Sequence, residues 1–361
     1  MNVHGVAYRT IWPIERRAVG IIDQALLPFE FATLEIDDCP SMVRAIATMQ
    51  LRGAPLIGVA AAYGMALAMN DDSGDAALER ACRDLLASRP TAVNLRWAVQ
   101  RQQQHLQRLA AGERRAQAWR EADAIAEEDV AMNRSIGSYA SALLAQTHAR
   151  LQRPVNVLTH CNAGWLATVD FGTALSGIYL AFDAGVPLHV WVDETRPRNQ
   201  GLLTAWELQA HGVDHTLIAD NAGGHLMQHG QVDLVIVGAD RVGGDGAVCN
   251  KIGTYLKALA AQDNCVPFYA AVPSPTIDWE LNDATREVPI EQRAGDELRI
   301  VHGMGEDGRR AKVALFGAAA AVDNPAFDVT PPRLVTGLVT ERGIASPREL
   351  AGLFGDRSNR G

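Results

Sequence analysis

The sequence predicts an α/β protein with a small, mainly helical N-terminal domain over residues 1–130 and a Rossmann-like domain with a parallel sheet over residues 131–361. Three observations support this prediction. The chain has 361 residues, a length that favours two domains. Its N-terminal part shows the apolar spacing of helices. From Pro154 onward, short β-branched runs alternate with helical stretches, and this alternation is typical of the βαβ units that form parallel sheets.

The N-terminal part predicts one short strand and several helices. The strand covers residues 31–36, and the helices cover 38–49, 55–69, 77–87 and 92–110. Apolar residues recur at helical spacing in the first helix, and Pro55 stands in the first turn of the second, where its missing N–H costs little. An Ala- and Glu-rich stretch, 111–145, predicts a long helical connector. The domain boundary therefore falls between residues 125 and 150.

The C-terminal part predicts strands and helices in alternation. The strands are 155–158, 188–192, 215–218, 234–237 and 268–272, and the helices are 166–184, 202–210 and 251–261. Four strands end in polar clusters, at 159–162, 193–196, 219–221 and 238–241. Ligands bind outside the carboxyl ends of parallel strands, so these clusters should meet at one rim. Any single cluster is better explained as turn residues, but the four together favour a binding site.

Composition excludes several classes of function. The formal net charge is -9, whereas nucleic-acid binding usually needs a basic face. The five cysteines are an odd number with wide spacing and no CxxC pair, which predicts neither a disulfide framework nor a zinc site. The N-terminus lacks the apolar core of a signal peptide, and no apolar run is long enough to span a membrane. We therefore expect a cytoplasmic protein with no metal, no nucleic acid and no membrane partner.

Three basic residues are candidates for binding an anion. Arg52 precedes Gly53, Ala54 and a helix that starts at Pro55. Glycine lets backbone approach a ligand, and a helix N-terminus attracts negative charge. Arg89 precedes the next helix but one, with Thr91 as its expected N-cap. The alternative for Arg52 is an arginine in a turn that merely caps structure, and the alternative for Arg89 is a solvated side chain near a helix start.

Lys251 follows a glycine-rich loop together with Asn250, and the pair should start a helix. Lys251 is therefore a third candidate for contacting a phosphate, and a solvated lysine is an equally good interpretation.

Two residues are candidates for chemistry. Cys161 follows a predicted strand and precedes an expected helix start, where the pKa of a thiol can fall. A buried, inert cysteine is at least as good an interpretation. Asp240 follows the strand 234–237, and a carboxyl group partly buried at a sheet rim can act as an acid because its pKa is raised. The alternative is a turn or N-cap aspartate.

Residues 303–308 match the dinucleotide-binding pattern G-x-G-x-x-G. They do not follow the first strand of a βαβ unit, and no suitably placed acidic residue follows them. We interpret this segment as a flexible loop.

Several ordered blocks of the sequence together resemble methylthioribose-1-phosphate isomerases. The blocks are 52–58, 89–95, 127–133, 159–162, 193–198 with 200–201, 238–241, 250–255 and 324–331. The resemblance covers residues 26–344. Two places depart from the family pattern: Ala163 and Trp165 after the cysteine, where Trp165 would narrow a pocket or simply pack, and the segment 299–322.

The resemblance implies a homodimer that isomerises 5-methylthioribose 1-phosphate to 5-methylthioribulose 1-phosphate in methionine salvage, without a cofactor. It implies that Cys161 and Asp240 are catalytic. The residues it implies for substrate binding are Arg52, Gly53, Ala54, Arg89, Gln200, Asn250 and Lys251. The same wider group contains ribose-1,5-bisphosphate isomerases and non-catalytic regulatory subunits of a nucleotide-exchange factor, which are the alternative functions.

Overall fold

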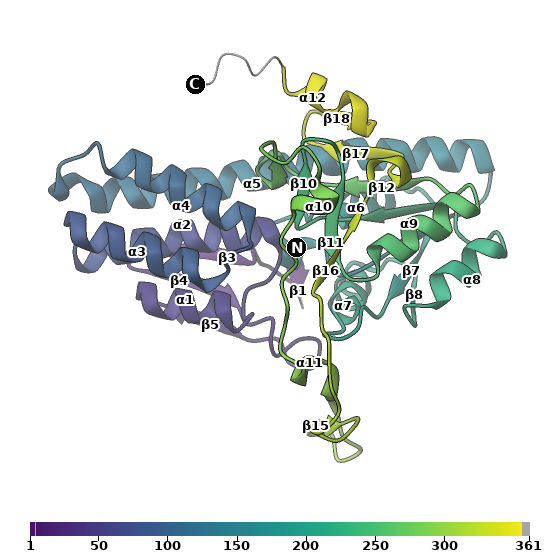
Figure 1. Ribbon diagram of the computed structural model, residues 1–361, viewed down its shortest axis with the longest axis horizontal. Helices are drawn as coiled ribbons and strands as arrows, with labels where there is room; N and C mark the ends of the chain where they lie inside the picture. Colours follow the sequence, from purple (N-terminus) through teal and green to yellow (C-terminus); the bar gives the residue numbers. More distant parts are fainter. Residues whose placement is uncertain (4, 356–361) are drawn as a thin grey trace.

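The computed structural model describes residues 1–3 and 5–355 and shows an N-terminal helical half beside a half built on a large sheet (Figure 1). Helix α5 (Ala111–Leu151) is continuous and runs along both halves. It packs on α2 on one side and on α6 (Ala174–Asp183) on the other. The predicted boundary after residue 130 falls inside this helix, and the division of the chain at that point stays a prediction.

The N-terminal half contains the predicted helices and more strand than predicted. The helices are α1 (Cys39–Ala47), α2 (Ala54–Asp71), α3 (Asp75–Ser88) and α4 (Val93–Leu106). Before them, β3 (Ile11–Ile14), β4 (Ala18–Ile22) and β5 (Thr33–Ile36) form an antiparallel sheet, and β1 (Asn2–Val3) pairs with β2 (Val6–Ala7). The sequence predicted only β5, because strands this short carry little period-two pattern.

Helix α2 forms the centre of the N-terminal half. Nearly all of its side chains are buried, from Leu56 and Ile57 to Met69. A helix that is apolar on every side has to be surrounded by other elements, and here α1, α3, α4 and α5 cover it. Its N-terminus at Ala54 is thereby held at a fixed place beside the sheet half.

The main sheet has seven strands in the order β18-β17-β12-β9-β6-β7-β8. The strands are β6 (Val155–Thr159), β7 (Leu188–Asp193), β8 (His215–Ile218), β9 (Leu234–Val237), β12 (Phe268–Ala271), β17 (Gly337–Thr340) and β18 (Gly343–Ala345). All pair in parallel except β18, which runs antiparallel at the edge. The predicted parallel sheet is therefore confirmed, and its carboxyl ends share one rim.

The helices of this half match the predicted alternation with two corrections. They are α6, α7 (Gly201–His211), α8 (Ala222–Gln228) and α9 (Thr254–Asp263). The expected helix over 166–184 is wrong at its start: the 3-10 turn Trp165–Ala167 and a loop precede α6. The expected helix start at Lys251 is also wrong, because this residue ends strand β11 (Val248–Lys251) and α9 begins three residues later.

A second, four-stranded sheet was not predicted. It has the order β13-β10-β11-β16 and contains β10 (Arg241–Gly243), β13 (Ile277–Asp278) and β16 (Phe327–Thr330) besides β11. Its strands come from distant parts of the chain, so only the tertiary fold pairs them. This sheet carries Asn250 and Lys251 to the rim of the main sheet.

The segment 303–308, which we expected to be a flexible loop, has regular structure. It lies in an antiparallel hairpin of β14 (Ile300–Met304) and β15 (Arg310–Ala314), which follows α11 (Asp296–Arg299) and projects from the molecule (Figure 1). The expected flexible loop is thus the turn of a regular hairpin. The remaining short helices are α10 (Ala284–Glu287) and α12 (Leu350–Leu353).

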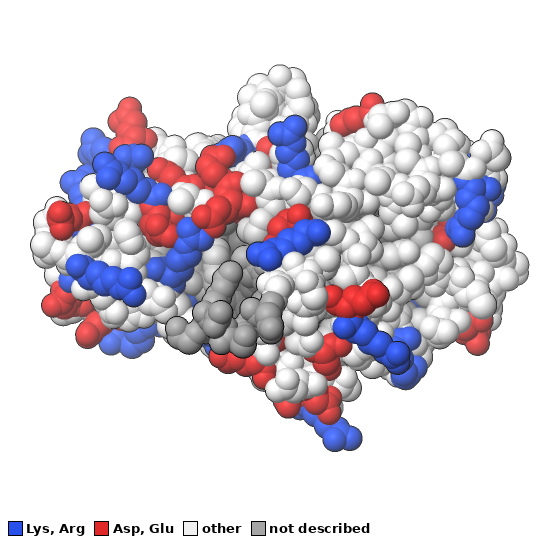
Figure 2. Space-filling model, turned by 90° about the horizontal axis from the view of Figure 1, so that it is seen from above, with Lys and Arg blue, Asp and Glu red and all other residues white. Residues whose placement is uncertain are grey.

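Charges on the face in Figure 2 are denser over the N-terminal helices than over the sheet half, and Lys and Arg are interspersed there with Asp and Glu. Within residues 1–3 and 5–355, no helix combines the length and the hydropathy that a membrane crossing requires.

Candidate active site

A pocket lies at the carboxyl ends of β6 and β9, where the N-terminus of α2 and strand β11 approach the main sheet. All nine residues that the sequence singled out line it: Arg52, Gly53, Ala54, Arg89, Cys161, Gln200, Asp240, Asn250 and Lys251. The remaining lining residues are Met49, Pro55, His160, Asn162, Ala163, Ala167, Thr173, Gly238, Ala239 and Phe327. Residues from seven separate segments of the chain therefore meet in one cavity.

The N-terminus of α2 forms one wall of the pocket. Gly53 has a φ of 97°, and a Cβ placed on it would lie 2.4 Å from the Cα of Ala167. Only glycine allows both the positive φ and this close approach. The Nε atom of Arg52 is buried and has no hydrogen-bond partner in the described chain. Burial lowers the pKa of Arg52 to about 10, with Arg198 adding to the effect. An unpartnered guanidinium beside a helix N-terminus is suited to binding an anion.

Arg89 supplies a second guanidinium from another direction. It follows the last residue of α3, and its Nε is also buried without a partner in the described part of the chain. A terminal nitrogen lies 3.5 Å from Glu291. Thr91 does not cap α4, since that helix begins at Val93 with Ala92 as N-cap, so the predicted capping is wrong. Arg89 thus reaches the pocket from a helix C-terminus.

Cys161 stands just beyond the end of β6 in the left-handed region, with a φ of 67°. Its amide donates to Thr195 Oγ1 over 2.8 Å, and its carbonyl accepts from Thr204 Oγ1 over 2.8 Å. A loop follows it rather than a helix, so the expected lowering of the thiol pKa by a helix N-terminus is wrong. Burial raises the pKa of Cys161, and the nearby Lys251 ammonium only partly opposes this.

Asp240 and Lys251 line the same pocket as Cys161. Burial raises the pKa of Asp240, opposed by Lys251 and Arg89. Burial also lowers the pKa of Lys251, whose Nζ donates to the carbonyl of Ala326 over 3.1 Å and lies 4.5 Å from the centre of the Phe327 ring. A carboxyl group of raised pKa and an amine of lowered pKa therefore line the same pocket.

Two amides complete the polar lining. Asn250 donates to Thr254 Oγ1 over 3.0 Å, which fixes its side chain. Gln200, which immediately precedes α7, has a buried Oε1 without a partner in the described chain. Such an atom is able to accept a hydrogen bond from a ligand hydroxyl, because a buried acceptor is rarely left unpaired.

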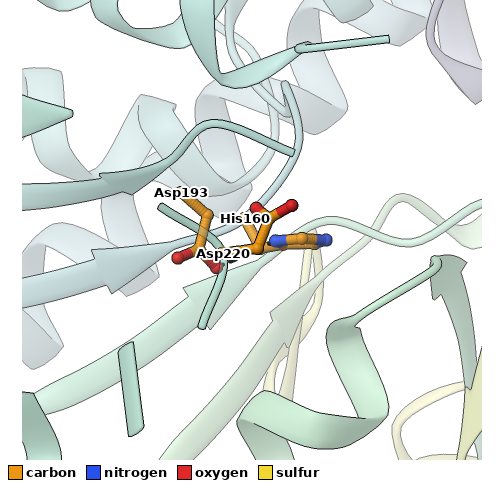
Figure 3. Close-up of side chains that lie close together, drawn as sticks. All are labelled: His160, Asp193 and Asp220. Carbon is orange, nitrogen blue, oxygen red and sulfur yellow. Dashed lines mark hydrogen bonds and ion pairs between the residues drawn. The ribbon is translucent and has the colours of Figure 1, made fainter. Parts of the chain in front are cut away.

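Next to Cys161 in the chain begins a cluster of four side chains, the buried His160, Asp193 and Lys257 and the half-buried Asp220. Figure 3 shows His160, Asp193 and Asp220 gathered together. His160 Nδ1 and Lys257 Nζ lie 2.9 and 3.2 Å from Asp193 Oδ2. Both carboxylate oxygens of Asp220 accept backbone amides, at 2.7 and 2.8 Å, from Thr195 and the residue after it.

His160, Asp193 and Asp220 have atoms close enough together to hold a metal ion. The Lys257 ammonium already neutralises the carboxylate of Asp193 and also donates to the carbonyl of Asp220, and His160 Nε2 contacts the carbonyl of Ile252 over 2.9 Å. These contacts occupy most polar atoms of the cluster, although Asp193 Oδ1 is buried without a hydrogen-bond partner in the described chain. We interpret the cluster as structural.

Glu207 on α7 is a residue that sequence reasoning missed. It is fully buried and accepts from the amides of Trp165 and Leu166, from Asn162 Nδ2 and from the Tyr179 hydroxyl, at 2.7–3.1 Å. Its carboxylate therefore holds the loop after Cys161. A single glutamate in a helix is ordinarily exposed to solvent, so local sequence does not mark Glu207 as buried.

Trp165 is buried and stacks on Trp206, with ring centres 6.4 Å apart. It does not line the pocket. Of the two expectations for this residue, packing is therefore the correct one.

Known proteins are similar to this chain in sequence and in fold. The model of the initiation factor 2 subunit family matches residues 50–347. The chain therefore belongs to that family.

Within it, the chain groups with the methylthioribose-1-phosphate isomerases. It is 58% identical to the Methylorubrum extorquens protein of that name, over 99% of both chains. The solved 5-methylthioribose 1-phosphate isomerase of Pyrococcus horikoshii has a TM-score of 0.82 and 38% identity, with 96% of each chain covered. A structure described as translation initiation factor eIF-2B, subunit delta, from A. fulgidus has a TM-score of 0.77 and 39% identity, covering 96% of this chain and 98% of that one.

Proposed function

We propose that the chain is an aldose–ketose isomerase that converts 5-methylthioribose 1-phosphate to 5-methylthioribulose 1-phosphate in methionine salvage. The observation that carries this proposal is one pocket that combines two arginines whose Nε atoms have no partner in the described chain, a half-buried thiol and a carboxyl group of raised pKa. The names of the similar proteins support it. No cofactor is needed for this reaction.

The pocket offers complementary surfaces for the two ends of such a substrate. Arg52, Arg89 and Lys251 would hold the phosphate, and the backbone at Gly53 and Ala54 lies beside them at the start of α2. Gln200 and Asn250 would bind sugar hydroxyls. The lining also includes the apolar side chains of Met49, Ala163, Ala167 and Phe327, which suit a thioether better than a second phosphate. This lining favours methylthioribose 1-phosphate over ribose 1,5-bisphosphate.

The phosphate on O1 of this substrate blocks the usual opening of an aldose ring through a free anomeric hydroxyl. In the proposed reaction, Asp240 gives its proton to the ring oxygen while the bond from that oxygen to C1 breaks. The hydrogen on C2 moves to C1, and the C2 hydroxyl loses its proton to become the ketone. That proton restores the acid, so the atoms balance without a further reactant.

Two routes bring the C2 hydrogen to C1. In the first, Cys161 removes the hydrogen as a proton and returns it to C1. In the second, the hydrogen moves as a hydride, and Cys161 stabilises the transition state. Its raised pKa keeps the thiol mostly protonated at neutral pH, and an apolar lining that excludes water suits a hydride shift.

The most informative experiment incubates the purified protein with each of the two sugar phosphates and follows ketose formation. We expect turnover of 5-methylthioribose 1-phosphate only. Cys161→Ser should lose about 10²–10⁴-fold in kcat, the usual range for a general acid or base. Cys82→Ser, which changes a buried cysteine on α3, should retain activity. Turnover of ribose 1,5-bisphosphate alone, or full activity of Cys161→Ser, would contradict the proposal.

The same assay in heavy water separates the two routes. Deuterium at C1 of the product supports the proton route. A product without deuterium at C1 supports hydride transfer, because a hydride does not exchange with solvent.

We further propose that the chain acts in the cytoplasm as a homodimer. The projecting hairpin and the segment after it expose large apolar side chains, at Met304, Val313, Leu315 and Phe316. Exposed apolar groups of this kind mark interaction surfaces. Sedimentation at micromolar concentration should give twice the mass of one chain, and a monomer under those conditions would contradict the dimer.

A further inference from the structure

The backbone of Cys161 adopts a conformation that its residue type disfavours. Its φ of 67° lies in the left-handed region, which residues with a Cβ seldom occupy. Residues in this region are retained where surrounding contacts hold them, often at functional sites. The peptide groups on both sides of the thiol must therefore be fixed by their neighbours.

Thr195 fixes the amide on the N-terminal side. Its Oγ1 accepts from the Cys161 amide over 2.8 Å and donates to the carbonyl of Asp193 over 3.0 Å. The Thr195 amide donates to Asp220 Oδ1 over 2.7 Å. The hydroxyl that orients Cys161 is thus itself oriented by the loop after β7 and the cluster described above.

Thr204 fixes the carbonyl on the C-terminal side. This residue lies in the first turn of α7, and its Oγ1 donates to the Cys161 carbonyl over 2.8 Å while accepting from Asn162 Nδ2 over 3.2 Å. Thr195 and Thr204 are both fully buried, and neither lines the pocket. Neither side chain therefore contacts a bound substrate.

We propose that Thr195 and Thr204 are positioning residues that hold Cys161 in its left-handed conformation and so aim the thiol at the reacting carbons. The proposal rests on the catalytic role proposed for Cys161. Each threonine supplies a hydroxyl at one side of the same residue, one as an acceptor and the other as a donor. Removing either hydroxyl leaves a buried peptide group of Cys161 unpaired, and the backbone then relaxes toward an ordinary φ. A displacement of about 1 Å in a reacting group can lower a rate 100-fold.

The test compares variants that lose the hydroxyl with variants that keep it. Thr195→Val and Thr204→Val preserve shape but remove the hydroxyl, whereas Thr195→Ser and Thr204→Ser retain it. Thr340→Val is the matched control: Thr340 is fully buried, accepts from the amide of Arg342 and donates to the carbonyl of Gly343, each over 3.1 Å. Strands β12 and β9 separate its strand, β17, from β6.

We expect Thr195→Val and Thr204→Val each to lower kcat about tenfold or more. KM and inhibition by inorganic phosphate should stay within about twofold of wild type, because the arginines that would bind phosphate are unchanged. The serine variants should recover most of kcat. Thr340→Val should lower the melting temperature about as much as Thr195→Val but leave kcat unchanged. If Thr195→Val does not fold, Thr204→Val tests the same inference from the other side of Cys161.

Alkylation by iodoacetamide gives a second measurement that does not depend on turnover. The rate of alkylation at Cys161 is measured on the peptide that contains this residue. In the valine variants this rate should differ from that of wild type, and in the serine variants it should return to the wild-type value.

The outcomes separate this inference from the proposed function. If Cys161→Ser is fully active, the catalytic role of the thiol is wrong. If Cys161→Ser is inactive but both valine variants keep the kcat and the alkylation rate of wild type, the positioning role is wrong while the function stands. Equal losses of kcat in Thr340→Val would also overturn the inference, because the effect would then be one of general stability.

Discussion

Two pairs of aspartate and lysine lie at the same rim of the sheet and differ in how they are partnered. In the inner pair, Asp193 Oδ2 lies 3.2 Å from Lys257 Nζ and 2.9 Å from His160 Nδ1. In the outer pair, Asp240 and Lys251 face the pocket, and within the described chain the Asp240 carboxylate makes no hydrogen bond to protein. The residue types are the same. In the inner pair Asp193 Oδ2 is held by a lysine and a histidine, although its Oδ1 has no partner in the described chain. In the outer pair Lys251 donates to the carbonyl of Ala326, and the Asp240 carboxylate is left to a ligand.

A pair of buried charges is therefore not in itself a functional site. Breaking a buried ion pair leaves an uncompensated charge and destabilises the fold. A titratable group that lines a cavity and is poorly solvated has a shifted pKa instead, and it is available for chemistry on a ligand. Substitutions in the inner pair should therefore act on stability, and those in the outer pair on activity.

Asp240→Asn should show the largest effect on activity. The amide cannot give up a proton, so kcat should fall about 10²–10⁴-fold, the range for loss of a general acid. The melting temperature should stay within a few degrees of wild type, because burial of the carboxyl group is already unfavourable to its charged form. Steady-state kinetics with thermal unfolding checks both. Near-normal kcat would remove Asp240 from the mechanism.

Asp193→Asn should show the largest effect on stability. It leaves Lys257 buried without its countercharge, which costs about 3–5 kcal/mol when a buried pair is broken. Chemical unfolding monitored by circular dichroism measures the change. If Asp193→Asn unfolds at the denaturant concentration of wild type but loses activity, the inner pair belongs to the active site and is not merely structural.

Asp129 on α5 provides a third buried carboxylate, and its effect should depend on pH. It accepts the Val169 amide over 2.8 Å, and burial raises its pKa to about 7. A raised pKa means that its contribution to stability is full below the unfolded pKa of about 4 and is lost as pH rises through 7. Between pH 5 and 8 the free energy of unfolding of the wild type should thus fall by about 2–3 kcal/mol more than that of Asp129→Asn, at 1.36 kcal/mol per pKa unit. Parallel pH-dependences of unfolding would contradict this.

Arg52→Lys should show the smallest effect, on binding alone. Lysine keeps the charge but loses the fork that binds phosphate through two nitrogen atoms. We expect KM to rise about tenfold, equivalent to ~1.4 kcal/mol. Arg114→Lys is the control, since Arg114 is buried and donates to the carbonyls of Ser73 and Leu106. It should lower the melting temperature without changing KM. An unchanged KM in Arg52→Lys would place the phosphate elsewhere.

Much of the candidate site could be predicted because its residues stand at strand ends and helix starts that local patterns mark. Cys161 and Asp240 follow apolar runs, and Gly53 precedes a helix that is apolar on every side. The strand that contains Lys251 could not be predicted in this way. It pairs with residues 327–330, more than 70 positions away, and no local pattern carries such a pairing.

The sequence by itself determined the parallel sheet, the order of its elements and the residue types at its rim, because apolar periodicity and strand-end chemistry are local properties of the chain. Only the tertiary structure decided the left-handed backbone of Cys161, the burial of Glu207 and which aspartate–lysine pair lies in the interior and which lines the cavity. These features depend on contacts between segments far apart in sequence, and burial and pKa arise only when those segments pack together.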